Sequence, residues 1–172
     1  MQAEEELVIE RLCQWVFGEL DRDTFVDWIC QESRLEPLLG KTLYLDLLSF
    51  DYSTPQGKFE SVVLVKNFLL STHREYCQKS EVVLILKQMI ADEIPLVRGL
   101  RQLVKLYHNG YDFIPINFVG YESETDSVPD PKQKHLWHAL AFWRGQRSLR
   151  LYRNAILREA KKFLEDLTSG AK

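Results

Sequence analysis

Residues 17–52 read FGELDRDTFVDWICQESRLEPLLGKTLYLDLLSFDY, and this stretch carries the densest local folding signals in the chain. Gly18 can close a first helix in the left-handed conformation that favours glycine. Asp21 can then cap the start of a second helix over about 22–33. The apolar side of that helix would be formed by Phe25, Trp28 and Ile29.

Two carboxylates lie on the other side of the same predicted helix. Asp23 and Asp27 are four residues apart, so a helix presents them side by side and away from the apolar residues. Together with Asp21 they form an acidic surface. A solvated helix face explains such a pair as well as a binding surface does, and both interpretations stay open at this point.

The segments around this stretch also have helical patterns. Residues 4–17 have a broad apolar side and begin with acidic residues, which suits the positive end of the helix dipole. Residues 41–50 fit either a helix or a strand. Residues 60–70 and 80–90 contain β-branched runs that are typical of strands, but the length of each apolar segment favours buried helices.

The second half of the chain begins with a predicted helix over 95–108, with Pro95 in its first turn. The longest irregular stretch follows at 110–131, where glycine, proline and acidic residues accumulate. We then expect a helix over 132–143, with Leu136, Leu140 and Trp143 on its apolar side, an interruption at Gly145, and a final helix over about 148–167. Within that last helix Arg153 falls inside the apolar stripe, where it needs either a carboxylate partner or an exposed surface.

These patterns predict an all-α fold, a bundle of about six to eight helices with one long irregular loop near 110–131. The chain has 172 residues and 45% hydrophobic residues, which is ordinary for a globular protein. A chain of this size buries roughly 70% of its unfolded surface, and we therefore expect a single helical domain over 1–172.

The lack of a recognisable targeting signal and the use of cysteine both favour a cytoplasmic location. The N-terminus has no basic region before an apolar segment, and no apolar run reaches the roughly 18 residues that span a bilayer. Cys13, Cys30 and Cys77 are odd in number and far apart, which disfavours a disulfide framework. We expect a cytoplasmic protein that does not associate with a membrane.

Charge is distributed unevenly along the chain. Residues 132–172 contain ten Lys/Arg and three Asp/Glu, a local charge of +7, whereas residues 1–131 carry a local charge of −10. Such a dipolar chain can attract a basic partner at one end and an acidic partner at the other. Attraction between the two halves of the chain is the alternative explanation.

The sequence contains few signs of catalysis or of metal binding. His135 and His138 share one side of a helix, but no third ligand occurs at a recognisable spacing. A thiol–imidazole pair between Cys77 and His73 is conceivable, although neighbours at that spacing are common by chance. No phosphate-binding glycine loop, nucleophile elbow or paired-carboxylate motif is present. We therefore predict neither an enzyme nor a metal or cofactor site.

A row of arginines in the C-terminal segment could contact phosphates. Arg144, Arg147, Arg150 and Arg153 are three residues apart, with Trp143 and Tyr152 beside them. The acidic composition of the chain and the absence of a recognisable nucleic-acid-binding motif disfavour nucleic acid as the partner. Ion pairing with acidic surface elsewhere in the chain is the simpler interpretation.

Residues 16–52 resemble the opening of small bacterial immunity proteins of the colicin-type and polymorphic-toxin systems. Residues 17–20 match a Phe/Leu-x-x-Gly-Glu-Leu/Ile turn in compressed form, and residues 25–28 match an acidic Phe-x-x-Trp helix. Residues 39–52 match a Leu-Gly…Tyr-Leu-x-Leu-(Ile/Leu)-Ser-Phe-Asp-Tyr run. The segment LVKLYHNGYDFI (103–114) is similar to a second recurring segment, whereas the basic C-terminal helix departs from the pattern.

The resemblance implies a helical cytoplasmic protein that binds and neutralises a cognate toxin domain. A carboxylate-rich surface can occupy the cationic site of a nuclease toxin, with aromatic side chains at its margin. The residues that we predict for partner binding are Asp21, Asp23, Asp27, Tyr44, Tyr52, Glu122, Glu124 and Asp126. The alternative is a helical adaptor or regulator that binds protein or RNA through the basic C-terminal helix.

Overall fold

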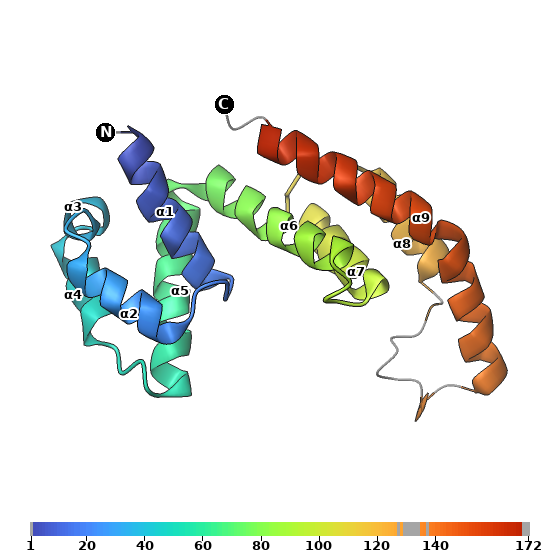
Figure 1. The fold of residues 1–172 in the computed structure, drawn as a ribbon, viewed down its shortest axis with the longest axis horizontal. Coiled ribbons are helices and arrows are strands. Elements are labelled where there is room, and N and C mark those ends of the chain that lie inside the picture. Colours follow the sequence, from blue (N-terminus) through green and yellow to red (C-terminus); the bar gives the residue numbers. More distant parts are fainter. Residues whose placement is uncertain (1, 127, 129–134, 137, 170–172) are drawn as a thin grey trace. The chain divides into compact units, whose positions relative to one another are not determined.

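The computed structural model describes residues 2–126, 128, 135–136 and 138–169. Within these residues the chain forms nine helices and no strand (Figure 1). The prediction of an all-α fold is confirmed, and the described helices outnumber the six to eight that the sequence indicated. Contacts divide the chain into two compact units, Met1–Ser80 (unit 1) and Glu81–Lys172 (unit 2). The expectation of a single domain over 1–172 stays a prediction.

The helices of unit 1 are mostly short, and those of unit 2 end with the longest helix of the chain. Unit 1 contains α1 (Gln2–Val16), α2 (Arg22–Gln31), α3 (Leu35–Leu39), α4 (Lys41–Ser49) and α5 (Pro55–Thr72). The next helix, α6 (Arg74–Ile90), begins in unit 1 and continues into unit 2. Unit 2 then contains α7 (Leu96–His108), α8 (Asn117–Thr125) and α9 (Ala139–Ser169).

Local signals set the helix ends of unit 1, and Gly18 and Asp21 act there as the sequence predicted. Gly18 and Gly40 adopt φ values of 77° and 79°, so both occupy the left-handed region that only glycine enters at no cost. The side chain of Asp21 accepts a hydrogen bond from the Thr24 amide and caps α2. Thr54 caps α5 in the same way, with Pro55 in the first turn.

The core of unit 1 forms where α1 and α5 pack together and the short helices close over them. Its fully buried large side chains include Leu12, Trp15, Phe25, Ile29, Leu35, Leu47 and Leu69. The β-branched runs that could have been strands lie inside α5 and α6, and residues 41–49 form α4. Each of these helices buries one apolar side, which outweighs the strand preference of individual residues.

Unit 2 has its own core, in which α8 packs against both α7 and α9. Its buried side chains include Leu86, Met89, Leu100, Leu103, Phe118, Ile156 and Ala160. Gly99 allows a close approach to α6, because a Cβ atom at this position would lie 2.2 Å from Met89 Cγ. Most of the Leu and Val residues of α7 are buried, as its strong helical periodicity predicts: Leu96, Val97, Leu100, Leu103 and Val104.

The predicted irregular loop over 110–131 is wrong for its central part, because Asn117–Thr125 form α8. Gly120 and the flanking prolines lowered the helical signal in the sequence. Burial of Phe118 and Thr125 in unit 2 stabilises the helix despite Gly120. Tertiary packing therefore overrides local propensity here.

The predicted interruption at Gly145 is also wrong. Helix α9 runs without a break from Ala139 to Ser169, and Gly145 is buried within it. A glycine inside a helix costs about 1 kcal/mol relative to alanine, which burial of the side chains further along α9 offsets. The helix expected over 132–143 lies partly outside the described residues, and its part from 139 onward is the start of α9.

Candidate functional site

An aromatic cluster beneath α2 fixes the position of this helix in unit 1. The rings of Trp15 and Phe25 stack with their centroids 4.0 Å apart and an interplanar angle of 2°. Tyr52 packs edge-on against both rings, with centroids 5.9 Å away. Trp15 Nε1 donates a hydrogen bond of 3.3 Å to Ser61 Oγ on α5. The indole is thus satisfied inside the core, and α2 is held by rigid contacts.

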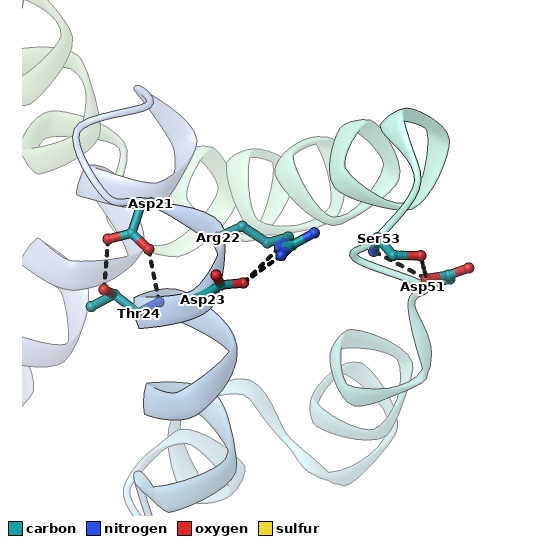
Figure 2. A network of polar contacts seen from close by, with 6 residues as sticks. All are labelled: Asp21, Arg22, Asp23, Thr24, Asp51 and Ser53. Carbon is teal, nitrogen blue, oxygen red and sulfur yellow. Dashed lines mark hydrogen bonds and ion pairs between the residues drawn. The ribbon is translucent and has the colours of Figure 1, made fainter.

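The outer side of α2 carries Asp21, Asp23 and Asp27, which we call the acidic face. Figure 2 shows that Asp21 turns toward Thr24, whose amide and hydroxyl donate hydrogen bonds of 3.0 and 2.6 Å to its carboxylate. These bonds lower the pKa of Asp21. Since both carboxylate oxygens are engaged in the cap, Asp21 has a structural role in α2.

Asp23 and Asp27 remain directed to solvent. Asp23 Oδ1 lies 2.7 Å from Arg22 Nη2, and both side chains are largely exposed, so the pair contributes little to stability (Figure 2). Asp27 is exposed one turn further along α2, and Cys30 is exposed on the same side. The two carboxylates that the sequence placed away from the core are therefore available for contact with a partner.

Asp51 is an exposed acidic residue that is not among those predicted for partner binding. It lies in the turn before α5, where its carboxylate accepts a hydrogen bond of 3.0 Å from the Ser53 amide and a second bond from the Ser53 hydroxyl. Figure 2 shows this turn in the same region of unit 1 as the start of α2. The run Asp-x-Ser-Thr-Pro is a known turn signal and could have identified the exposed carboxylate.

Tyr44 and Tyr52, the predicted aromatic margin, are both half-buried. Tyr44 Oη donates to the Ile29 carbonyl at 3.4 Å, and Tyr52 Oη donates to the Leu47 carbonyl at 2.6 Å. Burial raises the pKa of Tyr52 above its ordinary value. Both hydroxyls thus stabilise unit 1, and each ring leaves part of its surface exposed.

The second predicted acidic group lies on α8 and directly after it, not in a loop. Glu122 is half-buried, whereas Glu124 and Asp126 are exposed. Glu124 Oε2 accepts a hydrogen bond of 3.1 Å from Tyr152 Oη of α9, which raises the pKa of that tyrosine. These residues belong to unit 2, and the acidic face belongs to unit 1.

Arg153, which lies within the apolar stripe of α9, forms an ion pair with Asp92. Arg153 Nη2 lies 3.2 Å from Asp92 Oδ1, which confirms the pairing that the sequence offered as one of two solutions. By contrast, Leu136, Leu140 and Trp143 are exposed, although their spacing predicted a buried side. The first half of α9 therefore presents apolar surface to solvent.

Cys77 contacts another thiol. Cys13 and Cys77 are both buried in unit 1, and their hydrogen bond, together with burial, raises the pKa of Cys13. His73 instead packs against Phe68, with ring centroids 6.0 Å apart. Among the described residues, no group of three or more His, Cys, Asp or Glu side chains is placed to hold a metal ion.

Comparisons of this chain with protein-family models, curated proteins and solved structures found no match. The resemblance to immunity proteins accordingly stays a prediction. No helix in the described part of the chain combines the length and apolar character needed to cross a membrane.

Proposed function

We propose that this chain is a cytoplasmic immunity protein that binds and neutralises a cognate bacterial toxin domain and has no catalytic activity of its own. The observation that carries the proposal is the construction of α2. One side of this short helix is fixed in an aromatic core, while Asp23 and Asp27 project from the other. A rigid helix presents its carboxylates without an ordering cost on binding.

Charge complementarity supports a basic partner for this surface. Unit 1 contains fourteen acidic and eight basic side chains, a net charge of −6. A toxin that acts on nucleic acid has to present positive charge to its substrate. An inhibitor with an acidic surface is steered to such a site and competes with the substrate for it.

The residues of the surface have different roles in this proposal. Asp23 and Asp27 make the direct contacts, because Asp21 is engaged in the cap of α2. The exposed edges of Tyr44 and Tyr52 supply apolar contact area beside the carboxylates, since tyrosine is enriched at protein interfaces. Glu122 and Glu124 of α8, with Asp126 directly after it, provide a second acidic contact region.

The first test reverses the charge of the two exposed carboxylates. We expect the double variant Asp23→Lys/Asp27→Lys to keep its fold, because Asp21 still caps α2. It should bind the toxin encoded beside its gene at least about tenfold more weakly by calorimetry and fail to protect cells on co-expression. Glu5→Lys/Glu60→Lys is the matched control, since both residues are exposed in unit 1 on other helices. Unchanged affinity of the first variant would exclude this surface.

Cys30 offers an independent footprint of the same surface. It is exposed on the outer side of α2 one turn from Asp27, whereas Cys13 and Cys77 are buried. A maleimide should label Cys30 alone in the folded protein, and a saturating amount of the toxin domain should suppress that labelling. If Cys30 were still fully labelled in a complex of proven stoichiometry, the toxin would not bind over this side of α2.

A further inference from the structure

Large apolar side chains lie in solvent along the outer side of the first half of α9. The exposed fraction is 65% for Leu140, 59% for Trp143 and 75% for Leu151. Isolated exposed leucines are common on protein surfaces, but apolar side chains gathered along one helix indicate an interaction site.

Helical geometry places these residues in one continuous row. At about 100° per residue, Leu140, Trp143, Arg147 and Leu151 fall within an arc of about 80°, and they extend over about 16 Å of helix. We call this row the outer stripe. The opposite side of α9 carries Leu149, Tyr152 and the buried Ile156, which pack into unit 2. The outer stripe is therefore not part of the core of unit 2.

The outer stripe is also strongly cationic. Arg144, Arg147, Arg150 and Arg158 are exposed on or beside it. Among the described residues, none of these four forms an ion pair, whereas Arg153, on the other flank of α9, pairs with Asp92. Trp and Arg, together with Tyr, are enriched among the residues that dominate binding energy at protein interfaces.

We propose that the outer stripe of α9 binds an acidic amphipathic helix of a partner protein. Leu140, Trp143 and Leu151 would pack against apolar residues spaced three and four apart on that helix, and its flanking carboxylates would pair with the arginines. Three turns of helix match the length of the stripe. The outer stripe belongs to unit 2 and the acidic face to unit 1, and this proposal does not depend on the proposed toxin.

The chemistry of the stripe favours this partner over three others. Arg147 lies between Leu140 and Leu151, so insertion into a bilayer would bury a guanidinium in hydrocarbon. Nucleic acid could use the arginines and Trp143, but the leucines would gain nothing from a phosphate backbone. A second copy of α9 would place arginines opposite arginines, and these like charges would repel each other. Only an acidic and apolar helix satisfies both kinds of side chain.

The test uses the full chain and a labelled helical peptide of about eighteen residues, with Leu at heptad positions a and d and Glu at e and g. We expect saturable binding in fluorescence anisotropy. Leu140→Ser/Leu151→Ser and Arg144→Glu/Arg147→Glu should each weaken it at least about tenfold. All four residues are exposed, so the fold should be retained, which circular dichroism checks. A peptide with Lys in place of Glu should not bind.

The matched control removes the same charge elsewhere on α9. Lys161→Glu/Lys162→Glu should leave peptide affinity within about twofold, because these exposed residues lie several turns beyond the stripe. If this control lost as much peptide affinity as Arg144→Glu/Arg147→Glu, the loss would be due to net charge alone, and the proposal would be overturned. It would also be overturned by absence of peptide binding, or by stripe-dependent binding of a mixed oligonucleotide, of phosphatidylglycerol vesicles or of a second copy instead.

Discussion

At the scale of single residues, the Glu32–Arg34 pair ties the end of α2 to the start of α3. The Glu32 carboxylate accepts hydrogen bonds from the Arg34 backbone amide at 3.1 Å and from its guanidinium, with Nε at 2.6 Å. Arg34 Nη1 also reaches the Glu4 carbonyl of α1 at 3.4 Å. The guanidinium lowers the pKa of Glu32 to about 2. A two-sided contact of this kind is the strong form of an ion pair.

Replacing Glu32 by Gln should therefore destabilise the protein in a pH-dependent manner. A carboxylate with a lowered pKa stabilises the folded state above its unfolded pKa of about 4.3, and this contribution is lost as pH falls through about 2. At pH 7 we expect a loss of about 1–2 kcal/mol, because Arg34 is partly solvated. Urea unfolding at several pH values should show the difference from wild type shrinking between about pH 4.3 and 2.

Glu10→Gln is the control for this prediction. Glu10 is exposed on α1 and forms no ion pair within the described residues, so its replacement should change stability by less than about 0.5 kcal/mol. A loss for Glu32→Gln that stayed constant down to pH 2 would mean that the carboxylate charge contributes nothing to the pair.

At the scale of elements, two glycines inside helices differ in the space that is available for a side chain. Gly120 lies inside α8 with no atom within 4 Å of the position of a Cβ. Gly57 lies in the first turn of α5, where a Cβ would be 2.1 Å from the Asp51 carbonyl oxygen. The same substitution should thus have opposite effects at these two positions.

Gly120→Ala should stabilise the protein by about 0.5–1 kcal/mol, because alanine lowers the entropy of the unfolded chain and favours the helix. Gly57→Ala should destabilise it by about 2 kcal/mol or more, since the clash is with backbone that cannot rotate away. Chemical unfolding of both variants measures the difference. Destabilisation by Gly120→Ala would mean that α8 does not have the helical conformation described.

At the scale of the whole molecule, the chain builds two hydrophobic cores. Phe25 belongs to the core of unit 1 and Phe118 to that of unit 2, and both are fully buried. The charges are divided as well, with a net −6 in unit 1 and +3 in unit 2. The two units therefore differ in the partners that they can attract.

Because the two cores are separate, we expect a destabilising substitution in one unit to leave the other unit protected from hydrogen exchange. Phe118→Ala should remove about 3–5 kcal/mol from unit 2, and Phe25→Ala a similar amount from unit 1. Hydrogen exchange followed by mass spectrometry should show faster exchange mainly in the unit that carries the substitution. An equal loss of protection in both units would instead support one cooperative domain over 1–172.

Local chemistry made much of this structure predictable from the sequence. The helical class, the left-handed glycine at 18, the Asp21 cap and the outward direction of Asp23 and Asp27 all follow from periodicity and capping rules. The two solutions expected for Arg153, a carboxylate partner or an exposed surface, followed from the cost of leaving a charge unpaired in an apolar stripe, and the structure has an ion pair with Asp92. Apart from the ion pair of Arg153 with the distant Asp92, each of these features depends on residues a few positions apart.

Contacts between distant residues decided the rest. Residues 117–125 are helical because Phe118 is buried between helices, and α9 continues through Gly145 because its later turns pack in unit 2. Leu140 and Trp143 have a core-like spacing, yet they are exposed, since periodicity identifies a side of a helix and not what covers it. By itself the sequence determined the helical class, most of the helical segments and which side chains share a side, because these depend on local periodicity and capping; only the tertiary structure decided that 117–125 are helical and which of those sides are buried.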